Sequence, residues 1–459
     1  MAKSHVVIVS YPMQGHVIPL MEFARRLTNE GIKVTFVNTE AIHKVVTSNL
    51  EEKEGDLLHM ASISDGLESP EDRKDFRKTL KAMVEIMPGK LEELVEKISE
   101  EDRSKVTCIV ADSFMGWVIG VAKKMGIGSA AYCPSSATTQ AILMCAQKWI
   151  DDGLMNSDET RLIIVGIPQN NDMIQLCETM PPTKPSILPW MSVPGVDPGL
   201  LFQFSKVAAE ECTLADWILC NSSYELEPPI YNEFPQLLPV GPLLAGTQKD
   251  AKQTGQFWQE DSTCLTWLNQ QPTSSIIYIA FGSIATFTQT QFEHLALGLE
   301  TSNRPFMWVV RKNENCTFPD GYVERVGPRG KIVTWAPQQK VLAHSSVACF
   351  ISHCGWNSSL EGVTNGLPFL CWPFISDQFL DAAVICDTWK TGLGFDKDEE
   401  GVVTKDEIRR KIDELLGDKV FKDMALELKE KVTCSIRPGG SSYRNLCGFI
   451  DWVQGKESR

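Results

Sequence analysis

The chain has 459 residues and carries 44 Lys and Arg against 59 Asp and Glu, which gives a formal net charge of −15. So acidic a chain lacks the basic surface by which proteins hold DNA, RNA or anionic lipid, and this excludes a general binder of polyanions. Apolar residues at 43% and charged residues at 22% exclude a disordered or fibrous protein, and the length predicts two or three domains.

The first elements along the chain predict a strand–helix–strand unit. Residues 5–10 read as a buried strand, 11–15 as a turn, 18–30 as a helix with one apolar face, and 32–37 as a second strand. Gly31 ends the helix, since glycine readily adopts the left-handed conformation that often follows one.

The amino terminus and the cysteines predict a cytoplasmic protein. The apolar run at residues 6–9 is too short for an export signal, and no run of about 18 apolar residues predicts a membrane span. The 14 cysteines are scattered and form no C-x-x-C pair. We therefore expect free thiols in a reducing compartment rather than disulfides or a zinc site.

A similar unit recurs further along the chain. Residues 106–111 and 129–133 read as strands on either side of a helix over 114–125, and Asp112 directly follows the first of them. Strands that alternate with helices are typical of a parallel sheet covered on both faces. Residues 177–199 contain six prolines and predict a long irregular loop.

A second series of elements follows a polar segment at residues 247–256, which we interpret as an interdomain linker. The series comprises strands over residues 276–281, 306–310, 331–334, 347–351 and 367–371 and helices over 291–301 and 359–365. A terminal helix capped by Ser441 or Ser442 ends at residue 453.

The predicted fold class is therefore α/β, with two tandem Rossmann-like domains, each a doubly wound parallel sheet. We expect an amino-terminal domain over residues 1–246 and a second domain over 257–437. Residues 438–459 form a carboxyl-terminal helix that we expect to pack back on the first domain.

Parallel sheets bind ligands at the carboxyl ends of their strands, and His16 and Asp112 both stand at such ends. A neutral imidazole can accept a proton near pH 7, and an aspartate can hold the required tautomer. The two residues can therefore form a general base and its orienting carboxylate. Alternatively, each caps the helix that follows it.

The segment HCGWNS at residues 353–358 follows a strand and opens a helix. Unpaired backbone N–H groups and the helix dipole favour a phosphate there, and Gly355 allows a close approach of the backbone. His353 can pair with a phosphate oxygen. An ordinary capped helix is the alternative.

Other motifs are missing or stand in the wrong context. The string GIGSAA at residues 126–131 fits a dinucleotide fingerprint, but it follows a helix and enters a strand. The sequence has no P-loop, no G-x-S-x-G elbow and no H-E-x-x-H zinc helix. Asp396 and Asp398 form the only D-x-D, within a charged loop that gives little reason to expect a metal.

The 44 residues from Trp335 to Gln378 open with WAPQ, have HCGWNS at their centre and end in Asp-Gln. This segment resembles the signature of plant family-1 UDP-sugar-dependent glycosyltransferases. The string PMQGH at residues 12–16 and the Gly-Ser step at 282–283 also fit the family, so the resemblance covers the whole chain. One departure is Ala348, mid-strand, where the family usually has glycine.

The resemblance implies a GT-B architecture with the active site in a cleft between the two domains. It implies that Trp335 stacks on the uracil and that Glu361 accepts hydrogen bonds from the ribose. The other donor-site residues that it implies are Ala336 and Gln338 at the nucleoside, Ser283, His353, Asn357 and Ser358 at the diphosphate, and Trp356, Asp377 and Gln378 at the sugar.

The implied reaction is the inverting transfer of a sugar from a UDP-sugar to a hydroxyl of a small acceptor. His16 would act as the base with support from Asp112, and no metal or other cofactor is expected. Gln378 resembles family members that prefer UDP-glucose. We expect the acceptor near Phe114 and Met144, an apolar lining that fits a phenolic compound and a terpenoid alike, and we expect a monomer.

The sequence disfavours two functions of other classes. A nicotinamide-dependent oxidoreductase is disfavoured because neither first strand–helix turn carries the glycine fingerprint. A UDP-sugar binder without catalysis is disfavoured because His16 and Asp112 are both present.

Overall fold

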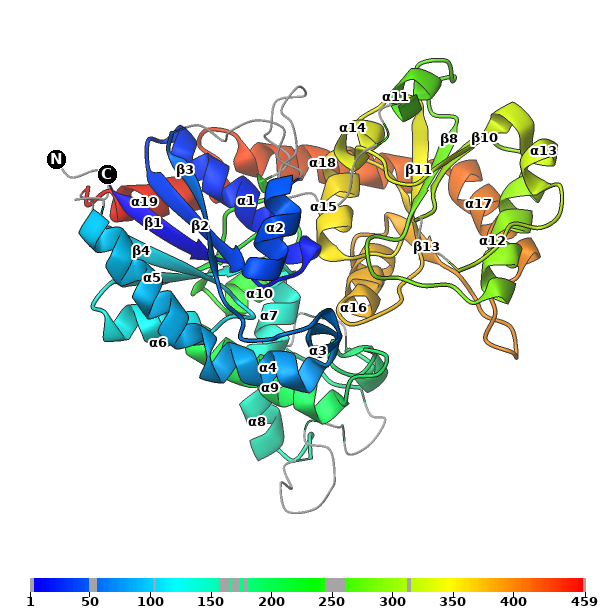
Figure 1. Ribbon diagram of the computed structural model, residues 1–459. Helices are drawn as coiled ribbons and strands as arrows, with labels where there is room; N and C mark the ends of the chain where they lie inside the picture. The colour runs from blue at the N-terminus through cyan, green and yellow to red at the C-terminus, as the bar shows by residue number, and fades with distance from the viewer. Residues whose placement is uncertain are drawn as a thin grey trace. The chain divides into compact units, whose positions relative to one another are not determined.

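The computed structural model describes residues 4–48, 56–101, 105–156, 166, 168, 173–176, 180, 182–243, 261, 263–311 and 315–456. The chain divides into two compact units, one of Met1–Phe257 with Ser435–Arg459 and one of Trp258–Cys434 (Figure 1). The predicted linker at residues 247–256 and part of the predicted loop at 177–199 lie outside the described residues.

The first unit is built on a seven-stranded parallel sheet with the strand order β3-β2-β1-β4-β5-β6-β7. Its strands are β1 His5–Val9, β2 Lys33–Thr39, β3 Leu58–Ile63, β4 Val106–Asp112, β5 Gly128–Cys133, β6 Trp217–Cys220 and β7 Leu237–Pro239. Because β1 pairs with both β2 and β4, the loops after β1 and β4 emerge side by side at the carboxyl edge.

Helices cover both faces of this sheet (Figure 1). The helices of this unit are α1 Gln14–Asn29, α2 Glu40–Ser48, α3 Pro70–Lys74, α4 Phe76–Glu85, α5 Met87–Glu101, α6 Trp117–Lys124, α7 Ala137–Met144, α8 Ala146–Asp151, the 3-10 turn η1 Pro185–Ile187, α9 Pro198–Cys212, α10 Pro228–Glu233 and α19 Ser441–Val453. Strand residues alternate between the faces, so Val6 and Ile8 pack with α1 and α19, whereas Val7 and Val9 pack with α5 and α6.

The second unit has a six-stranded parallel sheet with the strand order β10-β9-β8-β11-β12-β13. Its strands are β8 Ile276–Ala280, β9 Phe306–Val309, β10 Gly330–Val333, β11 Val347–Ser352, β12 Phe369–Cys371 and β13 Gly392–Gly394. Its helices are α11 Thr263–Leu268, α12 Gln289–Thr301, α13 Tyr322–Val326, the 3-10 turn η3 Gly327–Arg329, α14 Gln338–Leu342, α15 Trp356–Thr364, α16 Gln378–Ala383, the π-helix η4 Val384–Thr388, α17 Lys405–Gly417 and α18 Lys419–Ile436. Ile277 and Ile279 of β8 pack with α12 and α17 on one face of this sheet.

These sheets confirm the predicted fold class of two Rossmann-like domains. Two helices begin earlier than predicted, α1 at Gln14 instead of residue 18 and α15 at Trp356 instead of residue 359. Apolar periodicity does not mark the first turn of α1, because Gln14, Gly15 and His16 are not apolar. The prediction that Ser441 or Ser442 caps α19 was wrong, because Gly440 is the N-cap and no side chain makes a cap bond there.

Two further predictions concern the whole chain. The cysteines that the structure describes are free thiols, as expected from their scatter in the sequence. None of the helices in the described ranges is long and apolar enough to cross a membrane.

Candidate active site

The structure brings His16 and Asp112 together across 96 residues of sequence. Asp112 is the last residue of β4, and His16 lies in the first turn of the helix that follows the neighbouring strand β1. The Nδ1 atom of His16 lies 2.8 Å from Oδ2 of Asp112. A proton on Nδ1 then leaves Nε2 of a neutral ring as the proton acceptor.

The carboxylate of Asp112 is fully buried and is held by two further donors. The backbone N–H of Phe114 donates to Oδ1 at 2.9 Å, and that of Tyr11 donates to Oδ2 at 3.4 Å. Neither α1 nor α6 has a side-chain cap bond at its N-cap, so helix capping does not account for this pair.

Aromatic rings enclose the imidazole on two sides. The ring centroid of His16 lies 4.9 Å from that of Tyr11 and 5.2 Å from that of Phe114. Burial and the negative charge of Asp112 raise the pKa of Tyr11 to about 12, so its phenol stays protonated at neutral pH. The His16 side chain keeps 18% of its surface exposed.

Of the two residues predicted for the acceptor, only Phe114 contacts His16. Met144, the last residue of α7, packs against a different hydrophobic cluster around Ala131 and Cys133. Phe114 stands two residues after the end of β4, whereas Met144 stands at the end of a helix.

In the second unit, Gln338, Ser358 and Glu361 form one hydrogen-bonded group. The Nε2 atom of Gln338 donates to Oε2 of Glu361 at 2.6 Å and to Oγ of Ser358 at 3.0 Å. Trp335 and Ala336 directly precede α14, which begins with Gln338. A carboxylate, an amide and an indole at one edge of a sheet match the needs of a nucleoside.

His353 lies in a tight space between two glycines. A Cβ atom at Gly282 would lie 2.8 Å from Nε2 of His353, and one at Gly355 would lie 2.6 Å from it. Both distances are shorter than real Cβ contacts, so a side chain at either position would have to displace the His353 ring.

This packing changes the electrostatics of the ring. Burial lowers the pKa of His353 to about 4, since it penalises the charged form; the carbonyl of Ala280 opposes this and the positive charge of Arg311 adds to it. His353 is therefore neutral at pH 7 and carries a single ring N–H rather than a positive charge. A protonated histidine would instead offer a positive charge to a phosphate.

The start of α15 is open to an anion. Its N-cap is Gly355, which makes no side-chain cap bond, and Asn357 and Ser358 lie in the first turn. Cys354, just before it, has a left-handed φ of 65°, an unusual backbone state for a side-chain-bearing residue. Backbone strain of this kind is often found where a loop is shaped for a ligand.

The residues implied for the sugar differ in their surroundings. The Oε1 atom of Gln378 accepts the N–H groups of Phe374 at 2.9 Å and Ile375 at 3.1 Å, so the amide nitrogen is the end suited to a sugar hydroxyl. Asp377 is the N-cap of α16. Trp356 is only 3% exposed, and its ring centroid lies 6.0 Å from that of Trp389.

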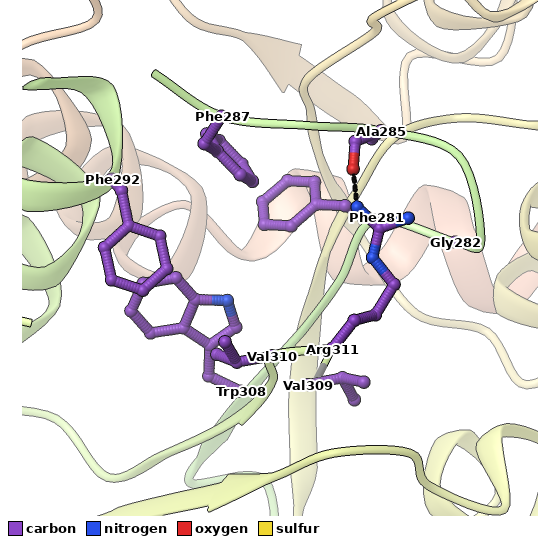
Figure 2. A pocket seen from close by; sticks show the side chains of 9 residues that line it. All are labelled: Phe281, Gly282, Ala285, Phe287, Phe292, Trp308, Val309, Val310 and Arg311. Atoms are coloured by element: carbon purple, nitrogen blue, oxygen red, sulfur yellow. Dashed lines mark hydrogen bonds between the residues drawn. The ribbon is translucent and has the colours of Figure 1, made fainter. Parts of the chain in front are cut away.

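A small hollow, partly open to solvent, lies beyond the carboxyl ends of β8 and β9 (Figure 2). Its lining comprises Phe281, Gly282, Ala285, Phe287, Phe292, Trp308, Val309, Val310 and Arg311. Ser283, which the resemblance places at the diphosphate, follows Gly282 directly and is partly exposed. Arg311 donates a hydrogen bond to the carbonyl of Ala285.

The sequence analysis did not single out Arg311, which stands two residues after the end of β9. It brings a positive charge to the edge of the sheet where His353 is neutral. Among the described residues, no cluster of three or more His, Cys, Asp or Glu side chains could hold a metal ion.

Comparison with known proteins assigns the whole chain to one family. Residues 205–432 match the family described as UDP-glucoronosyl and UDP-glucosyl transferase. UDP-glycosyltransferase 83A1 of Arabidopsis thaliana is 39% identical over 466 aligned residues, which cover 99% of this chain and 97% of that protein. The chain belongs to this glycosyltransferase family. Gallate 1-beta-glucosyltransferase of Quercus robur is 32% identical to it, over 99% of this chain and 91% of its own length.

Solved structures of glycosyltransferases have the same fold. A UDP-glucosyltransferase from Polygonum tinctorium capable of glucosylating indoxyl matches with a TM-score of 0.83 and 27% identity, over 99% of this chain and 100% of its own. Phytolacca americana UGT2, complexed with UDP-2fluoro-glucose and pterostilbene, matches with a TM-score of 0.80 and 26% identity, over 98% and 99% of the two chains. The glycosyltransferase therefore has GT-B domains and transfers a sugar from a UDP-sugar to a small molecule.

Proposed function

We propose that this glycosyltransferase transfers glucose from UDP-glucose to a hydroxyl of a small lipophilic acceptor, with inversion at the anomeric carbon and without a metal. The observation that carries the proposal is the 2.8 Å contact between His16 Nδ1 and Asp112 Oδ2 at the carboxyl edge of the first sheet. A base that is held in one tautomer by a buried carboxylate is what activation of a hydroxyl requires.

His16 is the catalytic base in this reaction, and Asp112 is its positioning residue. The Nε2 atom of His16 takes the proton of the acceptor hydroxyl while the oxygen forms a bond to the anomeric carbon. The bond from that carbon to the β-phosphate oxygen breaks, and UDP leaves with the electron pair from the opposite face. Asp112 stabilises the imidazolium that results.

The second unit supplies the groups that hold the donor. The N–H groups at the start of α15 and the neutral His353 donate hydrogen bonds to the diphosphate, whose negative charge grows as UDP leaves. Glu361 accepts the ribose hydroxyls, Trp335 stacks on the uracil, and Asp377 and Gln378 hold the sugar. These groups lie at one site, so they can hold the diphosphate even though the net charge of the chain is −15.

Relatives and neighbours support the choice of glucose and of a lipophilic acceptor. The relatives include the gallate 1-beta-glucosyltransferase of Quercus robur and the limonoid UDP-glucosyltransferase of Citrus unshiu. A neighbouring structure was solved with pterostilbene. The Tyr11 and Phe114 rings beside His16 suit an apolar aromatic or polycyclic alcohol, and we propose phenolic compounds and terpenoids as the acceptor classes.

The test is a panel of UDP-sugars against phenolic and terpenoid alcohols, with products identified by mass spectrometry and the anomer by NMR. We expect a β-glucoside from UDP-glucose at undiminished rate in EDTA, and a monomer by light scattering. A retained α-configuration, loss of activity in EDTA, or faster transfer from another UDP-sugar would each overturn the matching part of the proposal.

A further inference from the structure

Tyr278 lies in the middle of β8 and is only 1% exposed. Its strand neighbours Ile277 and Ile279 belong to the core on one face of the sheet, so Tyr278 points to the other face. There its ring centroid lies 5.2 Å from that of Phe350 in β11. A ring packed this way inside a sheet gives its hydroxyl a fixed position.

The Tyr278 hydroxyl donates to Oε1 of Gln338 at 3.2 Å. The other end of the same amide, Nε2, donates to Glu361 at 2.6 Å and to Ser358 at 3.0 Å. An ionised carboxylate can only accept hydrogen bonds, so the nitrogen must face Glu361 and the oxygen must face Tyr278. Hydrogen bonds at both ends of the Gln338 amide therefore fix its orientation.

This chain of hydrogen bonds joins three elements of the second unit. It runs from β8 through the first residue of α14 to Glu361 of α15, which is 6% exposed. A free glutamine side chain has several rotamers, and holding it in one costs conformational entropy. The Tyr278 hydroxyl helps to fix the Gln338 side chain before any ligand binds, and this offsets part of the entropy cost. Such an arrangement is called preorganisation.

We propose that Tyr278 is a positioning residue of the nucleoside site, acting through Gln338 to hold the Glu361 carboxylate where the ribose hydroxyls bind. The inference rests on the proposed function, because it takes Glu361 as the ribose acceptor. Its consequence is specific: Tyr278 contributes to the preference for a ribose over a 2′-deoxyribose without contacting either sugar.

The experiment compares UDP and 2′-deoxy-UDP binding to the full chain by isothermal titration calorimetry. For Tyr278→Phe we expect UDP to bind about tenfold more weakly, the size of one lost hydrogen bond near a charged group, and 2′-deoxy-UDP to lose clearly less. The donor KM should rise by a similar factor, with kcat at saturating UDP-glucose nearly unchanged.

Tyr322 provides the matched control. It is also 1% exposed and lies in the same unit, and no hydrogen-bond partner of its hydroxyl is found among the described residues. Tyr322→Phe removes the same atom from a buried ring, and we expect UDP affinity and the preference for ribose to be unchanged. Thermal unfolding of both variants controls for lost stability.

A double-mutant cycle with Gln338→Ala tests the route of the effect. If Tyr278 acts through Gln338, then Tyr278→Phe causes no further loss of UDP affinity in the Gln338→Ala background. Equal losses in both backgrounds, or equal losses for UDP and 2′-deoxy-UDP, would overturn the inference. Failure of the unmodified protein to bind UDP would instead overturn the proposed function.

Discussion

Two histidines, one in each unit, have opposite surroundings; His16 lies in the first turn of α1, and His353 directly follows β11. His16 has a buried carboxylate 2.8 Å from its Nδ1 atom and an 18% exposed side chain. His353 lies between two glycines with Arg311 as the charge that acts on it, and its pKa is lowered to about 4. One ring has a carboxylate partner, and burial keeps the other ring neutral.

The difference shows how one residue type can serve two tasks. A base must gain a proton during the reaction, so a neighbouring carboxylate assists it. A hydrogen-bond donor to an anion has only to keep its N–H in place, and tight packing achieves that without a charge. The predictions below test this contrast, from the largest expected effect to the smallest.

Replacing the base should have the largest effect. We expect His16→Ala to lower kcat for hydroxyl acceptors by roughly 10²–10⁴, the usual contribution of general-base catalysis, while UDP affinity stays the same. Steady-state kinetics and calorimetry measure the two quantities. His294→Ala, at a histidine whose ring accepts the N–H of Lys405, is the control. Near-normal turnover of His16→Ala would contradict the assignment of His16 as the catalytic base.

Replacing the partner of the base should have a smaller effect. Asp112→Asn keeps the shape but loses the charge and can favour the wrong tautomer of His16, so we expect kcat to fall on the order of 10²-fold. Because the two residues act as a unit, Asp112→Asn should add nothing in the His16→Ala background. A full additional loss there would show that Asp112 acts independently of the ring.

A methyl group placed against the His353 ring should weaken donor binding. Gly355 has an ordinary φ of −59°, so Gly355→Ala adds a methyl group 2.6 Å from the His353 ring without backbone strain. We expect about tenfold weaker UDP binding, as for one lost hydrogen bond to a charged group. At Gly394 a Cβ atom would meet nothing within 4 Å, so Gly394→Ala is the matched control. Equal UDP affinity for both variants would contradict the proposed role of His353.

The last effect concerns stability against pH. Between pH 6.5 and about 4 the unfolded chain binds a proton at residue 353 and the folded chain does not, so the free energy of unfolding falls as the pH falls. The shift sets an upper limit of about 3 kcal/mol, which the partial exposure of the ring reduces. His353→Asn should flatten this part of the curve of Tm against pH. An unchanged slope would mean that the ring is already protonated in the folded chain.

Much of the fold could be predicted from local patterns. The alternation of apolar strands and amphipathic helices predicts parallel sheets, and the carboxyl end of a strand is recognisable wherever a polar residue ends an apolar run. On that basis the sequence marks Asp112 and the segment at residues 353–358 as candidate site residues. The start of α1 at Gln14 has no such mark, because a polar first turn carries no periodic signal.

The sequence by itself determined the fold class and which polar residues stand at the strand ends, because both follow from periodicity over short stretches of chain. Only the tertiary structure decided that His16 meets Asp112 across 96 residues and that Tyr278 orients Gln338 across 60. It also decided that His353 is neutral, since its burial depends on Gly282 from another strand. Desolvation and hydrogen bonding depend on neighbours from distant segments of the chain, and a local sequence pattern does not reveal those neighbours.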